Sequence, residues 1–347
     1  MTPRQQGRRS TTIYSVAQLA GVSIATVSRV LQGTDATSPK TRANVLRAVE
    51  ELDYVPLGAA RSLAIQAHSA NGLVVPDLVG PYYSELLMGY ESAAAEFGQS
   101  VVLVVTNPRE DPERAVRELS SRVDGLVVAN STISDDAARS IARRTPVVLL
   151  ARPWVDGCDA VSAESVESAK ALTEHLLDHG RRRLLFVGDP DGSPDVNQRH
   201  SGFTTALSKA ETLAVGPAVR VGFHEGSGAE VVAQVVASAN RPDALVCAND
   251  ELALSTMKAL QRAGVSVPDD IAIVGWDDVM TARYVSPGLT TVRQPLYELG
   301  RAAATRLHER IAGDPTVPEP LILPTQLVLR SSCGCPEKDE HGYQRAG

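Results

Sequence analysis

The stretch YSVAQLAGVSIATVSRVLQG, residues 14–33, predicts two short helices joined by a tight turn. Ser15 and Gln18 have the spacing of a capping box, so a helix is expected to begin there. Gly21 can adopt the left-handed conformation that ends a helix. Ser23 can cap a second helix that runs from residue 24 to about residue 31. This local pattern separates the start of the chain from everything that follows.

A third helix is predicted to follow these two. Ser38 and Pro39 form a cap followed by proline at the first helical position, and we expect the helix to extend to about Leu52. Apolar residues recur along all three helices at the spacing of one helical face. We expect them to form a shared core of Val16, Leu19, Ala20, Val27, Val30, Leu31, Val45, Leu46, Val49 and Leu52. Three helices with a glycine turn between the first two form a helix-turn-helix unit.

The second helix of such a unit enters the major groove of DNA, and its early residues meet the base edges. Arg29 can bind the O6/N7 edge of a guanine, and the hydroxyl groups can bind phosphate oxygens. The residues predicted to face DNA here are Ser23, Ile24, Ala25, Thr26, Ser28 and Arg29. A three-helix bundle without a role in DNA binding is the alternative.

Charge is distributed unevenly along the chain, whose net charge is −7. Residues 1–68 contain eight basic and four acidic residues and carry +4, whereas the remaining 26 basic and 37 acidic residues carry −11. A basic head on an acidic body is typical of a protein that binds a polyanion. A solvated surface without such a partner is the alternative.

The segments VAQLAGVSIATVSRVLQG (16–33), SPKTRANVLRAVEELDYVP (38–56) and AARSLA (59–64) together resemble the DNA-binding head of the lactose-repressor (LacI/GalR) family. The resemblance runs without a gap from Thr12 to Ala64. It departs from the family at Ser15, where aspartate is usual, and at Gln32, where asparagine is usual. The predicted DNA-binding residues also include Thr12, Thr41 and Tyr54.

Residues 57–65, LGAARSLAI, resemble the hinge helix of that family. The resemblance implies that this segment folds in the minor groove, where paired leucines wedge open a central C-G base step. Leu63 is the matching residue. Ala60 would permit close approach of two hinges, and Arg61 would reach the DNA backbone or base edges. A leucine wedge is physically reasonable for a minor-groove kink. A linker helix with a merely packed Leu63 is the alternative.

After His68, strand-like runs alternate with helical ones, which predicts an α/β fold with parallel sheets covered by helices. The runs are NGLVVPDL (71–78), VVLVVT (101–106), DGLVVAN (124–130) and PVVLLA (146–151), with a helix near 83–97. The pattern then restarts with DAVSA (159–163), a helix at 165–179, RLLFVGD (183–189), VRVGF (219–223), DALVCAND (243–250) and IAIVGWDD (271–278). The tail supplies LTTVRQP (289–295), a helix at 296–312 and LILPTQLVLRSSC (321–333).

Two lobes accommodate this length better than one sheet does. The pattern resembles the type I periplasmic-binding-protein architecture, and the family resemblance continues to about Gly334. We therefore expect a helix-turn-helix domain at 1–56, a hinge or linker at 57–68, a two-lobed effector-binding and dimerisation domain at 69–334, and a polar tail at 335–347. The chain is expected to cross between the lobes near 161–164, 290–295 and 320–326.

Ligands of open parallel sheets bind beyond the carboxyl ends of the strands. Carboxylates, amides and aromatic rings follow the predicted strands there, which is the chemistry of a sugar site. The segment VNQRHSGF (196–203) resembles the family segment whose arginine clamps the effector, which implies that role for Arg199. The predicted effector-binding residues are Asp77, Tyr82, Tyr83, Asn130, Arg199, Phe223, Asn249, Asp277 and Gln294.

Several of these neighbourhoods also allow a purely structural role. At least one residue of each neighbouring pair, Asn249–Asp250 and Asp277–Asp278, is expected to be a helix cap, with Asp250 favoured in the first pair. Asp77 is expected either to hold its loop or to contact the ligand. Arg199 has an interlobe ion pair as its alternative, and Trp276 is either core or pocket wall. Ala151 stands where the family often has aspartate, which leaves room for an effector other than a simple hexose. Arg152 is expected to be exposed or to lie between lobes.

No metal site and no cofactor are predicted. Cys333 and Cys335 form a lone Cys-Gly-Cys, and a zinc site usually needs a second Cys/His pair. His175 and His179 are an i, i+4 pair for which no third ligand stands nearby in sequence, so solvent exposure is expected for them. The remaining cysteines, Cys158 and Cys247, lie far apart, which suits a reducing cytoplasm.

The sequence carries neither a Walker loop, nor a G-x-S-x-G elbow, nor an H-E-x-x-H helix, so an enzyme is not predicted. It shows no apolar run long enough to span a membrane and no secretory signal. We expect a cytoplasmic homodimeric repressor of carbohydrate-utilisation genes that binds a pseudo-palindromic double-stranded DNA operator and a small-molecule effector, most simply a sugar. The alternatives are a DNA-binding regulator controlled by a protein partner or a non-sugar metabolite, and a solute-binding protein.

Overall fold

The computed structural model describes residues 12–31, 37–54, 68–223 and 226–336. The chain divides into two compact units, Met1–His68 and Ser69–Gly347. The predicted DNA-binding residues Ala60, Arg61 and Leu63 lie outside the described residues, as do Gln32 and the tail from residue 337 onward.

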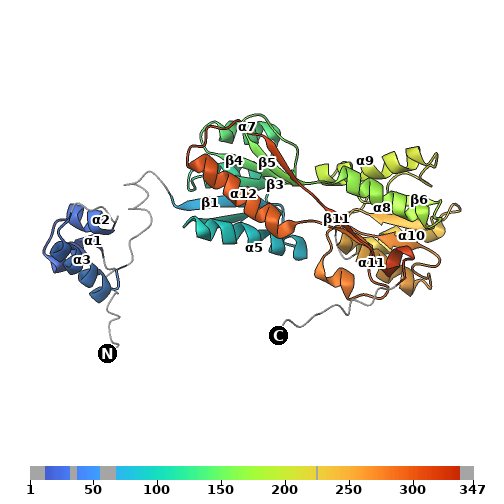
Figure 1. Ribbon diagram of the computed structural model, residues 1–347, viewed down its shortest axis with the longest axis horizontal. Helices are drawn as coiled ribbons and strands as arrows, with labels where there is room; N and C mark the ends of the chain where they lie inside the picture. Colours follow the sequence, from blue (N-terminus) through green and yellow to red (C-terminus); the bar gives the residue numbers. More distant parts are fainter. Residues whose placement is uncertain (1–11, 32–36, 55–67, 224–225, 337–347) are drawn as a thin grey trace, which may run out of the picture. The chain divides into compact units, whose positions relative to one another are not determined.

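The first unit contains the three expected helices, α1 (Ile13–Ala20), α2 (Ile24–Leu31) and α3 (Pro39–Glu51) (Figure 1). Helix α1 begins three residues earlier than predicted, because its N-cap is Thr12 and Ser15 falls within the first turn, so the predicted cap at Ser15 was wrong. The caps of the other two helices are confirmed. Ser23 Oγ accepts a hydrogen bond from the backbone N–H of Thr26, and Ser38 Oγ accepts one from Thr41, each at 3.2 Å.

The core of this unit differs from the prediction at two leucines. Leu19 is 46% exposed and Leu46 is 47% exposed, whereas Ala17 and Ala48 are buried in their place. Successive residues of a helix are rotated by about 100°, so the buried face of α1 passes through positions 13, 16, 17 and 20 and leaves position 19 at its edge. The same rotation puts position 46 outside the face formed by 45, 48, 49 and 52 in α3.

The second unit begins with a six-stranded parallel sheet in the order β10-β5-β4-β3-β1-β2, which forms the first lobe. Helices α5 and α12 share one core with the sheet, and α6 and α7 share another with the opposite face (Figure 1). The strands are β1 (Ala70–Val75), β2 (Ser100–Val105), β3 (Leu126–Ala129), β4 (Val147–Leu150), β5 (Asp159–Ala163) and β10 (Pro320–Leu323). The helices are α5 (Pro81–Glu96), α6 (Pro112–Ser120), α7 (Asp135–Ala142) and α12 (Leu296–Ile311).

The second lobe is built on a three-stranded parallel sheet in the order β6-β7-β8. Helices α8 and α9 pack on one face, and α10 and α11 pack on the other. The strands are β6 (Leu184–Val187), β7 (Ala244–Cys247) and β8 (Ala272–Val274). The helices are α8 (Val166–Asp178), α9 (Pro194–Lys209), α10 (Ser227–Ala237) and α11 (Asp250–Arg262).

Two strand predictions need correction. The run at 159–163, expected to open the second lobe, pairs with β4 in the first lobe instead, with Val148 opposite Asp159. Its Asp159 is buried and forms an ion pair with Arg310 of α12 in that same lobe. The run at 219–223 contributes only one isolated bridge, between Val187 and Val219, because the chain leaves the sheet directly afterwards.

The chain passes between the lobes at three places. The first lies between β5 and α8, the second between β9 (Thr291–Arg293) and α12, and the third between β10 and β11 (Gln326–Val328). Strands β9 and β11 pair with each other in an antiparallel ribbon. A helix cap was expected at Asp277 or Asp278, but the 3₁₀ helix that follows (Met280–Arg283) has Val279 at its N-cap, so that prediction was wrong. Asp278 instead joins the segments of this ribbon, since its carboxylate lies 2.6 Å from both Arg293 Nη2 and Arg330 Nη2.

Within the described part of the chain, no single helix has both the length and the apolar composition needed to cross a membrane. Helices α1 and α2 reach that composition only together, and they meet at an angle of 101°.

Candidate ligand cleft and DNA-facing surface

A cavity of about 600 Å³ lies between the two lobes of the second unit. Its walls come from the carboxyl ends of the strands and the helix starts that follow them, as expected for parallel sheets. The structure brings eight of the nine predicted effector-binding residues to this cavity. They are Asp77, Tyr82, Tyr83, Asn130, Arg199, Phe223, Asn249 and Asp277.

Gln294 does not line the cavity and lies behind it. Its Nε2 donates a hydrogen bond to Asp277 Oδ1 at 2.6 Å, and the side chain is 5% exposed. The structure therefore supports a positioning role for Gln294, which holds the Asp277 carboxylate from the crossover after β9.

Arg199 is held on three sides. Its Nη1 donates to the carbonyl oxygen of Ala248 at 2.6 Å, its Nη2 lies 3.9 Å from Asp195 Oδ2, and its Cζ lies 4.7 Å from the centre of the Trp276 ring. Trp276 is 1% exposed, so it belongs to the core and its ring supports the guanidinium. Among the described residues, the buried Arg199 Nε has no hydrogen-bond partner. One donor of this fixed guanidinium is therefore left unsatisfied.

The helix cap is Asn249 and not Asp250 as predicted. Asn249 is the N-cap of α11, and its Oδ1 accepts from the N–H of Leu252 at 3.0 Å. Asp250 is fully buried and accepts hydrogen bonds from the N–H of Val279 at 2.9 Å and from Thr291 Oγ1 at 2.6 Å. A helix that begins at residue 250 takes its cap from residue 249, so the prediction of Asp250 as the cap was wrong. Asn249 still lines the cavity, and its amide NH₂ is not used by the cap.

The carboxylates of the cavity share an environment that disfavours negative charge. Burial raises the pKa of Asp277 to about 7, although Arg199 and Gln294 act in the opposite direction. Burial likewise raises the pKa of Asp195, which Arg199 partly offsets, and burial together with Asp77 raises that of Glu251. Asp195 and Glu251 line the cavity and were not predicted, although Asp195 stands four residues before Arg199 on α9 and could have been found from that spacing.

The first lobe supplies aromatic and amide groups. Asn130 Nδ2 donates to Tyr83 Oη at 2.8 Å, and the edge of one tyrosine ring meets the other, with the centres of Tyr82 and Tyr83 4.9 Å apart. The buried Asn130 Oδ1 has no hydrogen-bond partner among the described residues. From the second lobe, Phe223 is 40% exposed, so its ring is available to a ligand. Asp77 also orders its own loop, since Oδ1 accepts from the N–H of Val79 at 3.0 Å.

Arg152 was expected to be exposed or to lie between the lobes, and the structure corrects this. It is 7% exposed within the first lobe, donates to the carbonyl oxygen of Ile133 at 2.9 Å and pairs with Asp135 at 2.5 Å. Ala151 beside it is buried and is not among the residues that line the cavity.

On the first unit, Ile24, Ala25 and Arg29 are exposed on α2, as the DNA-facing prediction requires. Ser23 and Thr26 are joined by a hydroxyl–hydroxyl hydrogen bond of 2.9 Å, and the predicted Thr12, Ser28 and Thr41 are half-buried. Tyr54 is 6% exposed and packs in the core of the three helices. The structure therefore gives the Tyr54 ring a packing role, and its contact with DNA stays a prediction.

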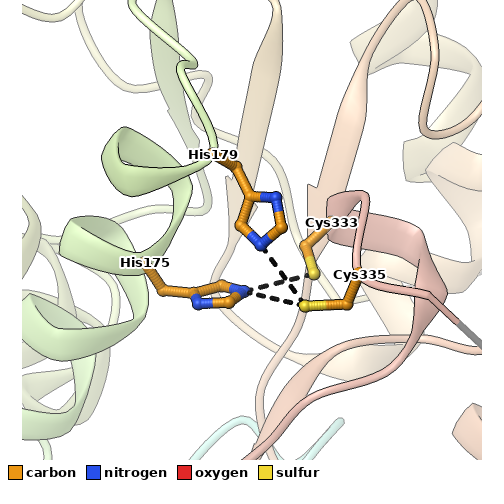
Figure 2. Close-up of side chains that lie close together, drawn as sticks. All are labelled: His175, His179, Cys333 and Cys335. Carbon is orange, nitrogen blue, oxygen red and sulfur yellow. Dashed lines mark hydrogen bonds between the residues drawn. The ribbon is translucent and has the colours of Figure 1, made fainter. Parts of the chain in front are cut away.

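The structure also brings together four residues that the sequence left apart. His175 of α8 and His179, the C-cap of that helix, meet Cys333 and Cys335 of the C-terminal segment (Figure 2). The expectation that the Cys-Gly-Cys lacks a second pair of ligands was wrong, because residues more than 150 positions earlier supply that pair.

Comparison with known proteins agrees with this organisation. Residues 12–56 match the family of bacterial regulatory proteins of the lacI type, and residues 173–333 match a periplasmic binding protein-like domain. The chain is 31% identical to the ribose operon repressor of Halalkalibacterium halodurans over 95% of this chain and 99% of that protein. The chain belongs to the lacI family of bacterial regulatory proteins.

Two further similarities place this lacI family member among DNA-binding repressors. It is 32% identical to the HTH-type transcriptional repressor PurR of Mannheimia succiniciproducens over 92% of this chain and 98% of that one. Its fold matches a lac repressor dimer bound to operator and the anti-inducer ONPF, with a TM-score of 0.84, 28% identity, and coverage of 94% of this chain and 99% of that chain. These relatives confirm the predicted family and fold, and they confirm the expectation that the protein is a regulator and not an enzyme.

Proposed function

We propose that this protein represses genes of carbohydrate use, and that a sugar bound between its two lobes controls its hold on operator DNA. The observation that carries the proposal is the interlobe cavity of about 600 Å³, whose walls bring together eight of the nine predicted effector-binding residues. A concave site of this size, lined by aromatic rings and a few polar groups, is typical of small-molecule binding.

The chemistry of the walls supports a polyhydroxylated ligand. Asp277 and Asn249 offer both acceptors and donors, which suits hydroxyl groups that act as both. Tyr82, Tyr83 and Phe223 can cover the apolar C–H face of a sugar ring. Burial, which raises the pKa of several wall carboxylates, disfavours negative charge in the cavity and so favours a neutral ligand over an anionic one.

We further propose that the protein acts as a homodimer on a pseudo-palindromic operator, as two-fold symmetry of the protein requires. The lac repressor to which it is similar is a dimer bound to operator. Sugar binding that changes the angle between the lobes would then alter the affinity for DNA. This coupling is reciprocal, so operator DNA must change the affinity for the sugar by the same factor.

The test is a thermal-shift screen of pentoses, hexoses, disaccharides, polyols and purines on the full-length protein. An effector at about 100 times its dissociation constant adds roughly 2.7 kcal/mol of stability. We expect a sugar to raise the melting temperature of the wild type and not that of Arg199→Ala. Arg139→Ala, on the surface of α7 and outside the cavity, is the matched control and should respond as the wild type does.

The same screen can overturn the proposal. A purine that stabilises the wild type, and not Arg199→Ala, would replace the sugar. No stabilisation by any of the compounds, in protein that still binds operator DNA, would favour control by a protein partner.

Binding of DNA is tested separately with Arg29→Ala. Loss of a bidentate contact with guanine should cost roughly 1–3 kcal/mol and relax the sequence preference at one position of each half-site. Binding selections on a randomised operator measure this, with Arg47→Ala on α3 as the control for a simple loss of positive charge. An unchanged preference at every position would refute the base-reading role of Arg29.

A further inference from the structure

Four side chains with metal-binding atoms converge at one point in the second lobe. His175 Nε2 lies 3.3 Å from Cys333 Sγ and 3.5 Å from Cys335 Sγ, and His179 Nε2 lies 3.3 Å from Cys335 Sγ (Figure 2). All four ligating atoms lie within 4.8 Å of one another. The cluster is outside the interlobe cavity, and the proposed function does not use it.

Three of these distances are close to those of a tetrahedral zinc site. With zinc bonds of about 2.3 Å to sulfur and about 2.0–2.1 Å to nitrogen, a nitrogen and a sulfur ligand lie about 3.6 Å apart. Three of the four nitrogen–sulfur pairs of the cluster are separated by 3.3, 3.3 and 3.5 Å. All four ligating atoms lie within 4.8 Å of one another, so the side chains are already close to the arrangement that one zinc ion needs.

Hydrogen bonding alone accounts poorly for this arrangement. A ring nitrogen of neutral histidine is either one donor or one acceptor, yet His175 Nε2 faces two sulfur atoms. Cys335 Sγ faces two imidazole nitrogens, and a thiol can donate to one and accept from the other, so His175 Nε2 is the atom whose contacts exceed its hydrogen-bonding capacity. A cation at the centre satisfies all four atoms at once, because each directs one lone pair toward it.

The local backbone explains how each pair is aimed. His175 and His179 are four residues apart, so they project from the same face of α8 at its C-terminal end. Cys333 ends a short 3₁₀ helix, and Gly334 follows with φ of 106°, a conformation that favours glycine. The tight turn at Gly334 directs both sulfur atoms to the same side.

The surroundings resemble those of a structural metal site. Cys333 is buried, His175 and Cys335 are half-buried, and His179 is exposed, so an ion can enter from solvent. Thr290 Oγ1 lies 3.1 Å from Cys333 Sγ, where a hydroxyl can orient the sulfur. Four protein ligands fill a tetrahedral shell and leave no position for a substrate, which is typical of structural and not of catalytic zinc.

We propose that His175, His179, Cys333 and Cys335 bind one zinc ion, which fastens the segment after β11 to helix α8. Mixed thiolate and imidazole ligands in a tetrahedron select zinc over magnesium and calcium, which require oxygen ligands. On binding, each thiol loses its proton to solvent as its sulfur bonds to the metal.

The ion would join two layers of the second lobe. Ser332, next to the first cysteine of this segment, already donates from Oγ to the carbonyl oxygen of Ile273 on β8 at 2.6 Å and accepts from the N–H of Thr290 at 2.8 Å. This segment is thus attached to the sheet. A zinc ion bound by its cysteines and by the two histidines would attach α8 to the same segment, on the face of the sheet that α8 covers.

The test uses the untagged full-length protein, purified with a non-chelating reductant from cells grown with added zinc. We expect one equivalent of zinc per chain by elemental mass spectrometry. After removal of the metal, titration with Co²⁺ should give the visible bands of tetrahedral cobalt with thiolate ligands and should saturate at one equivalent. Both signals should be lost in Cys335→Ser and in His179→Asn, whose side chains lie at the outer side of the cluster.

Cys158→Ala is the matched control, since it removes a thiol of the first lobe and should leave one equivalent of metal in place. Far-ultraviolet circular dichroism of each variant shows whether loss of metal accompanies a folded chain. A folded wild type without bound zinc and without the cobalt spectrum would overturn the proposal. A disulfide between Cys333 and Cys335 would also overturn it. Protein purified without reductant would then have a mass two hydrogens lower than the reduced chain, and it would contain no zinc either before or after reduction.

Discussion

The interlobe cleft and the His/Cys cluster are both polar groupings in the same unit, and they are built in opposite ways. The cleft encloses about 600 Å³ and leaves Asn130 Oδ1 and Arg199 Nε unsatisfied among the described residues. The cluster has its ligating atoms within 4.8 Å of one another, and each of them faces a partner in the cluster. The first geometry suits a molecule, and the second suits a single ion.

The difference shows how each site affects the free energy of unfolding. A cleft that must stay open keeps buried carboxylates and unmatched donors, so it reduces the stability of the empty protein. A metal site stabilises the folded chain once the ion is bound. Substitutions in the cleft should therefore change ligand binding or relieve strain, whereas those in the cluster should lower stability and leave ligand binding intact.

The largest effect is expected for Asp277→Asn in the cleft. The pKa of Asp277 is raised by burial from 3.8 to about 7, so between these values the folded chain keeps a proton that the unfolded chain has lost. The free energy of unfolding contributed by this group therefore falls as the pH rises from about 4 to 7, by up to about 4 kcal/mol. The amide that replaces this carboxyl group cannot ionise, so the variant should not show this fall.

Urea unfolding at a series of pH values measures the difference between the variant and the wild type. It should be constant below pH 4, favour the variant increasingly up to about pH 7, and then level off. Asp136→Asn, at an exposed carboxylate of α7, is the control. If the free energies of unfolding of wild type and Asp277→Asn changed in parallel with pH, burial of Asp277 would not reduce the stability of the protein.

The next effect is expected for Cys335→Ser in the cluster. At free zinc of about 100 times its dissociation constant, the wild type should gain roughly 2.7 kcal/mol of stability over its metal-free form, and the variant should gain none. Affinity for the effector should be equal in both proteins. Unfolding in zinc-buffered and chelator-containing solutions gives the stability, and calorimetry gives the affinity. A wild type whose stability ignores zinc, or a variant with weakened effector binding, would break the contrast between the two sites.

The smallest effect is expected for Phe223→Ala. Its half-exposed ring contributes little to the core, so the free energy of unfolding should change by less than about 0.5 kcal/mol. Loss of the aromatic face should weaken effector binding by about 1 kcal/mol, roughly fivefold. Calorimetric titration measures this, with the exposed Leu213→Ala of the same lobe as the control. Equal affinities would remove Phe223 from the ligand surface.

Sequence reasoning located most of the cleft because one rule generates it. The carboxyl ends of parallel strands meet at one edge, so the residues after each strand come together whatever the loops do. The rule does not say which of two neighbouring polar residues faces inward. That choice depends on where the following helix begins, which is why Asn249 caps α11 and Asp250 is buried behind it.

The His/Cys cluster follows no such rule. Its halves come from α8 and from the segment after β11, and nothing in the spacing of either pair indicates the other. In the helical head, the helix starts at Ser23 and Ser38 followed from local capping, whereas the exposure of Leu19 and Leu46 depends on which face the neighbouring helices cover. Features set by neighbouring residues, such as helix caps, could be predicted from the sequence. Contacts between segments far apart in the sequence could not.

The three crossings between the lobes have a mechanical consequence. Two of the three crossings pair as the β9–β11 ribbon, and Asp278 binds Arg293 and Arg330 beside it. We expect three separate connections to resist sliding and twisting of one lobe against the other more than they resist a change in the angle between the lobes. We therefore expect the relative motion of the lobes to be reduced mainly to one degree of freedom, the angle at which the cleft opens. On the proposed function, a ligand in the cleft would act on DNA binding through that one angle, so ligands of different shapes would produce signals of the same kind that differ in how far the cleft closes.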